Sequence, residues 1–562
     1  MRPLPATILL AVTLGACSET ALEYDLVVRD GTVYDGSGGP PRVADLWISG
    51  DRIVAVGAVE GGRARTEIDA RGMAVSPGFI NLLSWATDSL IADGRSQSDI
   101  RQGVTLEVFG EGWSYGPLNP AMKEYMESRQ ADIRYPIEWT TLAEYLEHLE
   151  RRGVSTNVAS FVGATTVRVH ELGFADRAPS TGELERMRQH VRRAMEDGAL
   201  GVGSSLIYAP AYYASTGELV ALAEVAAEYD GLYISHIRNE SYSLLEALEE
   251  LITIAERAGA RAEIYHLKAA GRDNHGKLDE VIDRVERARS EGLQVSADMY
   301  TYTAGATGLD AAMPPWVQEG GYEAWAERLR DPEVRRRVLR EMVEISPEWE
   351  NLRLMAGDDG TLLSGFKNEA LREYQGMTLA EVAALRGTSP AETALDLVIE
   401  DGSRVGVIYF LMSEDNVRRK IGLSWMGFGS DAGSLAPEGV FLSYNPHPRA
   451  YGTFARLLGR YVRDEGLIPL EEAIHRLTAQ SADKLRLRGR GRLAPGYFAD
   501  VVVFDPATIA DHATFADPHR YSTGVRDVLV NGVRVLAEGE HTGATPGRVV
   551  RGPGWTGWDE GD

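Results

Sequence analysis

Short runs of alternating apolar and polar residues stand at both ends of the chain. They cover residues 24–36, 44–48 and 52–57 near the N-terminus, and residues 499–505 and 525–532 near the C-terminus. A period of two with many β-branched residues, punctuated by glycine, is typical of short antiparallel strands. Because the texture is the same at both ends, we expect one small β-sandwich domain built from residues 22–74 and 484–552.

Between these ends, short apolar runs alternate with longer amphipathic segments such as residues 181–197 and 241–258. Strands that alternate with helices indicate repeated βα units and a parallel sheet. The predicted strands are Ala74 to Asn81, Val104 to Glu111, Asn157 to Gly163, Gly201 to Leu206, Leu232 to His236, Ala262 to His266, Gln294 to Asp298, and Gly427 to Asp431. Eight such strands predict a (β/α)8 barrel of the TIM type over residues 75–483.

The last two predicted strands are separated by a much longer interval than the others. Residues from about 314 to 416 carry Arg, Glu, Leu and Trp in helical patterns. We therefore expect a helical insertion above the mouth of the barrel, in the position of a lid.

Length and charge narrow the picture only slightly. A chain of 562 residues exceeds what one hydrophobic core usually organises, so a large domain with a smaller one is expected. Its 44% hydrophobic and 25% charged residues are those of an ordinary globular protein. The formal charge of -25 argues against a nucleic-acid partner, because phosphate binding needs clustered Lys and Arg.

The single cysteine, Cys17, closes an N-terminal segment that resembles a bacterial lipoprotein signal. Arg2 is followed by an apolar run from Ala6 to Leu14, and then by Gly15, Ala16 and Cys17. This run is too short to span a bilayer, which favours a signal peptide over residues 1–17. The alternative is an apolar first helix of the fold. The resemblance implies that Cys17 is lipidated, so that a lipid anchor alone holds the protein at the membrane of the cell envelope.

Three predicted strands end in a residue that can carry chemistry. Strand five ends at His236, strand six at His266 and strand eight at Asp431. In barrel enzymes the active site lies at the C-terminal ends of the strands. Two imidazoles on adjacent strands would lie within reach of one divalent metal ion. A single histidine is more often a surface or core residue, and the joint placement is what favours ligation.

Asp431 has two interpretations. Asp commonly caps a helix, and the residues after it do not exclude that role. Its position at a strand end, in the same site as two histidines, favours a general base that takes a proton from water and returns it to a leaving amine.

Motifs along residues 22–555 together resemble the N-acyl-D-amino-acid deacylase group of the amidohydrolase superfamily. Each motif is weak alone, but their number and order are specific. They are YDLVVRDGTVYDGSGGP, PGFI, GALGVGSSLIYAP, SHIRNE, YHLKAAG, DMYTYTAG, FGSDA, HPRAYGTFARLLGRYVR and GRLAPGYFADVVVFD.

The resemblance implies roles for six residues. His236 of SHIRNE and His266 of YHLKAAG become zinc ligands, and Asp431 becomes the catalytic acid and base. Contacts to the substrate carboxylate and the scissile carbonyl fall on Lys268, Tyr302 and Arg449. Lys and Arg suit a carboxylate because they donate charge-assisted hydrogen bonds, although solvated surface cations remain the alternative for both, and packing remains one for Tyr302.

Two stretches of the chain depart from the family pattern. Superfamily members usually carry His-X-His after the PGFI segment, where this chain has Leu83 and Trp85. The deacylase group places a cysteine ligand after strand two, where Gly112 aligns and Glu111 precedes it. The favoured interpretation is one Zn²⁺ held by Glu111, His236 and His266.

Two other interpretations of this site stay open. The metal could be weakly held or exchanged, with Asn81 or Ser84 helping through water, or the site could have lost its metal and bind a ligand only. The leading hypothesis is hydrolysis of a C–N bond in a small N-acyl amino acid that carries a carboxylate. Dipeptides, cyclic amides and a non-catalytic envelope binding protein are the alternatives.

Overall fold

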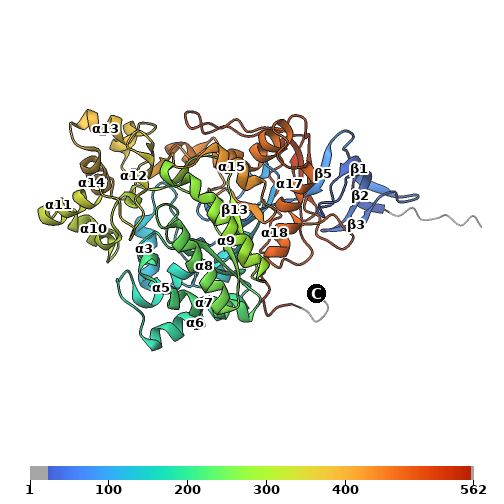
Figure 1. The fold of residues 1–562 in the computed structure, drawn as a ribbon. Helices are drawn as coiled ribbons and strands as arrows, with labels where there is room; N and C mark the ends of the chain where they lie inside the picture. Colours follow the sequence, from blue (N-terminus) through green and yellow to red (C-terminus); the bar gives the residue numbers. More distant parts are fainter. Residues whose placement is uncertain (1–22, 559–562) are drawn as a thin grey trace, which may run out of the picture.

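The computed structural model describes residues 23–558. The predicted signal segment and Cys17 lie outside the described residues. Two bodies stand side by side in Figure 1, a small β-domain near the N-terminus and a barrel, and a third group of helices lies at the far end of the barrel. A (β/α)8 barrel with a small β-domain drawn from both chain ends is thereby confirmed.

The small domain is one nine-stranded sheet in the order β21-β20-β19-β18-β5-β1-β2-β3, with β4 paired to β1. Successive side chains of a strand point to opposite faces of the sheet. One face buries a core around Leu46, Ile48 and Val501, and on the other face Val502 and Phe504 belong to the large core of the barrel. The strands are β1 Glu23–Val33, β2 Arg42–Ser49, β3 Arg52–Val56, β4 Arg63–Asp69, β5 Ala74–Pro77, β18 Val501–Phe504, β19 Val525–Val530, β20 Val533–Ala537 and β21 Glu540–His541.

The barrel contains the predicted parallel strands in chain order. They are β6 Phe79–Asn81, β7 Val104–Phe109, β8 Asn157–Ser160 with β9 Val162–Gly163, β10 Gly201–Ser205, β11 Leu232–His236, β12 Arg261–Ile264, β13 Val295–Met299 and β17 Met426–Phe428. The first and last strands meet where Leu82 N donates to Phe428 O at 3.2 Å. This bond and that from Asp431 N to Leu83 O, 2.8 Å long, close the ring.

The run Ala74 to Asn81, expected as one barrel strand, is divided between the two domains. Residues 74–77 pair with β1 and β18 in the small sheet, whereas residues 79–81 pair with β7 in the barrel. Gly78 makes the junction, and a Cβ there would lie 2.0 Å from the Thr105 hydroxyl oxygen. Only glycine fits this close approach, which explains why an unbroken apolar run serves two sheets.

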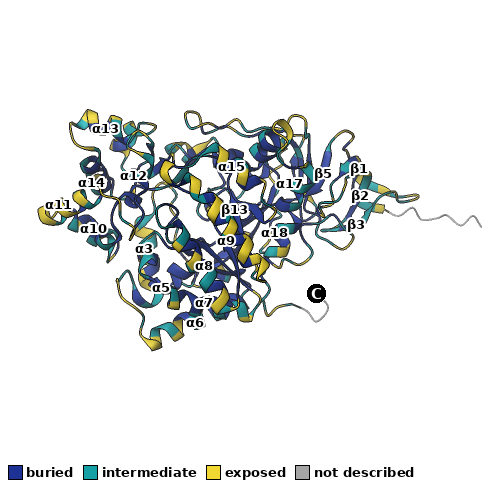
Figure 2. Cartoon of the chain, in the orientation of Figure 1, coloured by how far each residue is buried: buried dark blue, intermediate teal, exposed yellow. Residues whose placement is uncertain are grey.

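Helices cover the outside of the barrel, with buried faces inward and exposed faces outward in Figure 2. They are α1 Ser89–Ala92, α2 Gln97–Ile100, α3 Pro120–Arg129, α4 Leu142–Arg152, α5 Ala164–Leu172, α6 Thr181–Glu196, α7 Thr216–Glu228, α8 Leu244–Ala258, α9 Leu278–Ser290, α15 Glu414–Ile421, α16 Arg449–Arg456, α17 Leu470–Leu477 and α18 Ala479–Lys484. Among residues 23–558, no helix has the length and apolar character needed to cross a lipid bilayer.

The segment between β13 and α15 contains strands as well as the expected helices. β14, β16 and β15 form a three-stranded antiparallel sheet, and with the helices they enclose a hydrophobic core of their own. The elements are β14 Gly305–Gly308, α10 Tyr322–Arg328, α11 Pro332–Glu341, α12 Leu352–Ala356, β15 Thr361–Gly365, α13 Leu379–Arg386, α14 Pro390–Asp401 and β16 Gly406–Tyr409. We call residues 305–409 the insertion. Because its first strand is Gly305–Gly308, it begins earlier than the helical pattern indicated.

Shorter helical turns connect these elements. The 3-10 helices are η1 Ala211–Tyr213, η2 Arg272–Lys277, η3 Leu309–Ala312, η4 Pro315–Gln318, η5 Glu369–Tyr374 and η6 Gly439–Ser443, and a π-helix, η7 Leu457–Asp464, follows α16. Beyond the small domain, the chain returns to the barrel, where Val550 N donates to Val158 O at 2.8 Å. The C-terminal segment thus lies against the barrel wall.

Candidate active site

A cavity of about 650 Å³ collects the polar residues that end the barrel strands. Six of the candidate site residues predicted from the sequence line it: Glu111, His236, His266, Lys268, Asp431 and Arg449. The insertion supplies another part of the wall, including Thr307, Asp310, Tyr322 and Arg404. The barrel therefore presents the chemistry, and the insertion encloses it.

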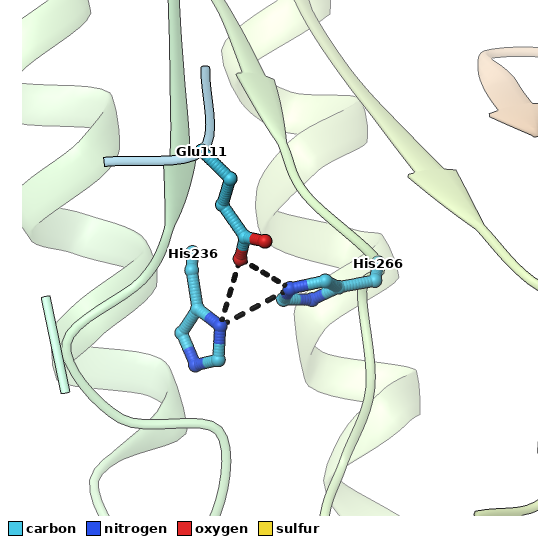
Figure 3. Close-up of side chains that lie close together, drawn as sticks. All are labelled: Glu111, His236 and His266. Atoms are coloured by element: carbon cyan, nitrogen blue, oxygen red, sulfur yellow. Dashed lines mark hydrogen bonds and ion pairs between the residues drawn. The ribbon is translucent and has the colours of Figure 1, made fainter. Parts of the chain in front are cut away.

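Glu111, His236 and His266 point toward one another (Figure 3), and all three line this cavity. Glu111 Oε1 lies 2.8 Å from His266 Nε2 and 3.3 Å from His236 Nδ1, and the two nitrogens are 3.1 Å apart. All three side chains are buried. Burial alone would raise the pKa of Glu111, but the two histidines outweigh it and hold that pKa well below its usual range.

This donor set fits a divalent metal ion. Ligand atoms about 2.0–2.2 Å from a tetrahedral Zn²⁺ lie roughly 3.3–3.5 Å from one another. Of the three separations here, 3.3 Å falls within this range, 3.1 Å is slightly shorter and 2.8 Å is about half an ångström shorter, and the atoms are one carboxylate oxygen and two imidazole nitrogens. Two imidazoles and one carboxylate form a known catalytic zinc set with an open position. Glu111 thus lies beside the two histidines, as expected for the carboxylate that the sequence suggested as a replacement for the cysteine ligand.

Asp431 lies beside this trio and contacts two further residues. Its Oδ2 is 2.7 Å from Arg449 Nη1, and its Oδ1 accepts a hydrogen bond of 3.2 Å from Trp85 Nε1. Burial raises the pKa of Asp431 above its usual range, and the Arg449 guanidinium opposes this rise without cancelling it. A carboxylate with a raised pKa is better suited to accept a proton and give it back.

The backbone is strained at two of these residues. His266 has φ 34° and Asp431 has φ 50°, both in the left-handed region that non-glycine residues rarely adopt. His266 N donates to Asp298 Oδ1 at 2.8 Å, and Asp431 N donates to Leu83 O at the same distance. These bonds hold each residue in a conformation that turns its side chain away from the strand and into the site.

Lys268 is paired within the protein. Its Nζ donates to both oxygens of Glu240 at 2.8 and 2.9 Å and lies 2.7 Å from His266 Nδ1. Glu240 O in turn accepts a hydrogen bond of 2.7 Å from Ala270 N, and Glu240 N donates to Glu350 Oε1 of the insertion at 3.2 Å. Burial and the Glu240 charge raise the pKa of Glu350 to about 8. The insertion thus reaches the metal ligands through a short polar chain.

Tyr302 is not among the residues that line the cavity. Its hydroxyl donates to Asp511 at 3.1 Å, and Arg456 lies over its ring. Tyr300 lines the cavity instead, with Arg449 over its ring at 4.5 Å. Its buried hydroxyl has no hydrogen-bond partner among the described residues. Both tyrosines stand in DMYTYTAG, and only the exact end of β13 at Met299 tells which one faces the site.

Sequence reasoning also missed Glu240 and Glu350. Glu240 ends the SHIRNE motif, four residues after His236, so the motif itself was a signal. Glu350 had none, because it comes from the insertion. Asn81 and Ser84, considered as helpers of a weakly held metal, are absent from the cavity lining. Asn81 bonds Asp99 and Ser430, and Ser84 bonds Glu107.

A second group of the same residue types lies half-buried on α5 and α6. Glu171 Oε1 is 3.0 Å from His170 Nδ1 and 3.1 Å from His190 Nε2. Its other oxygen accepts from Arg186 at 2.6 Å. Because Arg186 already compensates the charge of Glu171, we interpret this group as a surface ion-pair cluster that is separate from the cavity.

Comparison with known proteins assigns the chain to a family. The amidohydrolase family profile matches residues 66–536. D-aminoacylase of Alcaligenes xylosoxydans xylosoxydans is 34% identical over 531 residues, which are 94% of this chain and 97% of that protein. The chain belongs to the amidohydrolase family. The resemblance to the deacylase group is confirmed, and so is the amidohydrolase class of enzyme.

Two solved structures resemble this amidohydrolase over 94% of its length and 100% of theirs, each with a TM-score of 0.77. One is D-aminoacylase, 32% identical, described for a binuclear metal centre with one-metal activation and second-metal attenuation. The other is N-acyl-D-glutamate deacylase of Bordetella bronchiseptica, 31% identical, in complex with zinc and a phosphonate that mimics the tetrahedral intermediate. Metal dependence is therefore shared by the family members that this amidohydrolase matches over nearly its whole length.

Removal of a predicted ligand should remove the metal from this amidohydrolase. Glu111→Gln, His236→Ala and His266→Ala each take one donor from a three-donor set, so bound zinc should fall from about one equivalent per chain toward zero. Elemental analysis after gel filtration measures it. His148→Ala is the control, because His148 of α4 packs on Trp139 and is not part of the cavity lining. Full zinc content in all three ligand variants would contradict the assignment.

Proposed function

We propose that this amidohydrolase removes the acyl group from an N-acyl-D-amino acid by hydrolysis of its amide bond. This proposal rests on one observation: the buried trio of Glu111, His236 and His266 lies with Asp431 in one cavity. The relatives named D-aminoacylase and N-acyl-D-glutamate deacylase support both the reaction and the D configuration.

The reaction needs an activated carbonyl, a nucleophile and a proton carrier. A divalent cation held by Glu111, His236 and His266 would polarise the scissile carbonyl and acidify the attacking water. Asp431 takes a proton from that water while the water oxygen forms a bond to the carbonyl carbon. As the C–N bond breaks, Asp431 gives the proton to the departing amine nitrogen. The products are a carboxylic acid and a free amino acid.

The substrate carboxylate is recognised by Arg449 with the help of Tyr300. The Nε atom of Arg449 makes no hydrogen bond among the described residues, nor does the Tyr300 hydroxyl, whereas Nη1 of Arg449 is paired with Asp431 at 2.7 Å. Buried donors without partners are costly unless a ligand satisfies them. Lys268 contributes positive charge nearby, although Glu240 already accepts its hydrogen bonds. Tyr300 thus takes the role that the sequence had given to Tyr302.

Aromatic rings form much of the remaining wall of the cavity. Five of them come from different loops and from the insertion: Trp113, Phe174, Tyr208, Tyr322 and Trp325. Aromatic walls favour a large apolar ligand group, since each ring buries substantial area when it is covered. The proposed substrate therefore carries a bulky acyl group or side chain, in addition to its carboxylate.

A substrate panel tests this proposal. The zinc-loaded protein is given N-acyl-D- and N-acyl-L-amino acids with small and bulky groups, and the released amine is measured. The D series should be favoured. Replacing the substrate carboxylate by a neutral amide should lower kcat/KM by roughly tenfold or more, because charge-assisted bonds to Arg449 are lost. Binding without release of amine from any compound would instead establish the non-catalytic alternative.

Asp431→Asn should abolish turnover and spare the metal. The amide cannot carry the proton, so kcat/KM should fall by about 10²- to 10⁴-fold, with zinc content unchanged. Asp511→Asn is a matched control, because Asp511 also pairs with an arginine, Arg456 Nη1 at 3.0 Å, and is not part of the cavity lining. An Asp431→Asn enzyme with wild-type turnover would show that another group carries the proton.

The location of the protein is a separate part of the proposal. The segment from Arg2 to Cys17 supports export and lipidation at Cys17, with the enzyme on the bacterial cell envelope. Cys17→Ser should leave the protein in the soluble fraction and block incorporation of labelled fatty acid. Continued membrane attachment of that variant would contradict a lipid anchor at Cys17.

A further inference from the structure

Trp85 joins two carboxylates of the site. Its indole Nε1 donates to Glu111 Oε2 at 2.9 Å and to Asp431 Oδ1 at 3.2 Å. Each carboxylate therefore uses one oxygen for Trp85. The other oxygen of Glu111 faces the two histidines, and the other oxygen of Asp431 faces Arg449. A single N–H thus lies between the predicted metal ligand and the predicted base.

The main-chain segments that carry Trp85 and Asp431 are joined to each other by hydrogen bonds. Trp85 N donates to Ala432 O at 3.0 Å, and Asp431 N donates to Leu83 O at 2.8 Å. These bonds flank the bridge between Ser84 and Ala432. The backbone segments that carry Trp85 and Asp431 are thereby bonded on both sides, so the main-chain position of one residue is tied to that of the other, and the indole N–H then joins the two side chains.

Two carboxylate oxygens that lie within about 3 Å of one point need positive charge or a donor at that point. An imidazole at position 85 would place a metal-binding nitrogen beside these two oxygens and favour a metal ion. The indole N–H is a donor only and cannot bind a metal. Leu83 is fully buried in the core and offers no ligand either.

We propose that Trp85 is a positioning residue that takes the place of a second metal ion. Its N–H holds Asp431 in the orientation for proton transfer, and its ring occupies the space that a second cation would need. The inference rests on the proposed function for its kinetic part only, since the number of bound metal ions can be measured without turnover.

Metal stoichiometry tests the first part. All proteins carry His190→Ala, so that zinc on the surface cluster of His170, Glu171 and His190 does not enter the count. In excess zinc, the chain with Trp85 should retain about one equivalent after gel filtration. Trp85→His puts an imidazole between the two carboxylates and should raise the count to about two. Cobalt absorption spectra should show the added site.

Kinetics of Trp85→Phe test the second part. The ring remains and the donor is lost, so kcat should fall by about tenfold or more while KM changes much less and the first metal is retained. Trp316→Phe is the matched control, because Trp316 Nε1 donates to Glu341 at 2.7 Å in the insertion, and Trp316 does not line the cavity. Its kcat should equal that of the wild type.

The possible results separate this inference from the proposed function. Two zinc ions in the chain with Trp85, or an unchanged kcat in Trp85→Phe, would overturn the role of Trp85 and leave the deacylase function standing. One zinc ion in a chain that releases no amine from any N-acyl amino acid would overturn the function, while the stoichiometric result would still support the placement of Trp85.

Discussion

The buried carboxylate of Glu111 is the group around which the site is organised. An ionised carboxylate removed from water is strongly destabilising unless it is paired and hydrogen-bonded. Here its compensation comes from three different strand ends: His236 at the end of β11, His266 after β12, and Trp85 in the segment after β6. The barrel must therefore bring these ends together for the charge to be tolerated. A bound cation would satisfy the same requirement more fully.

Strain at the strand ends is the second physical feature of the site. Left-handed backbone at a non-glycine residue costs about 1–3 kcal/mol, and both His266 and Asp431 adopt it. Each is offset by a hydrogen bond from its own backbone N, to Asp298 and to Leu83 respectively. The strained backbone thus lowers the stability of the fold, and it orients two side chains, one a predicted metal ligand and the other the predicted base.

The insertion both encloses the cavity and is connected by hydrogen bonds to the predicted metal ligands. Glu350 accepts from the backbone of Glu240, and Glu240 accepts from Lys268, which lies against His266. The same insertion has a hydrophobic core that also packs against Ala270, Ile207 and Tyr208 of the barrel loops, so the segment that carries Glu350 belongs to a packed unit. Displacement of the insertion would remove the hydrogen bond from Glu240 to Glu350. Access to the cavity is therefore linked to the positions of Glu240, Lys268 and His266.

The sequence by itself determined the elements and the residues at their ends. Apolar runs between amphipathic helices are a local signal of burial, so they located the barrel strands and placed His236, His266, Asp431 and Glu111 at one edge. Tertiary structure alone decided which side chains from distant segments meet. Gly78 divides one apolar run between two sheets, Tyr300 rather than Tyr302 faces the cavity, and Trp85 spans Glu111 and Asp431. The reason is that periodicity records how far each residue is buried, whereas these contacts depend on ångström-scale positions set by the closed barrel.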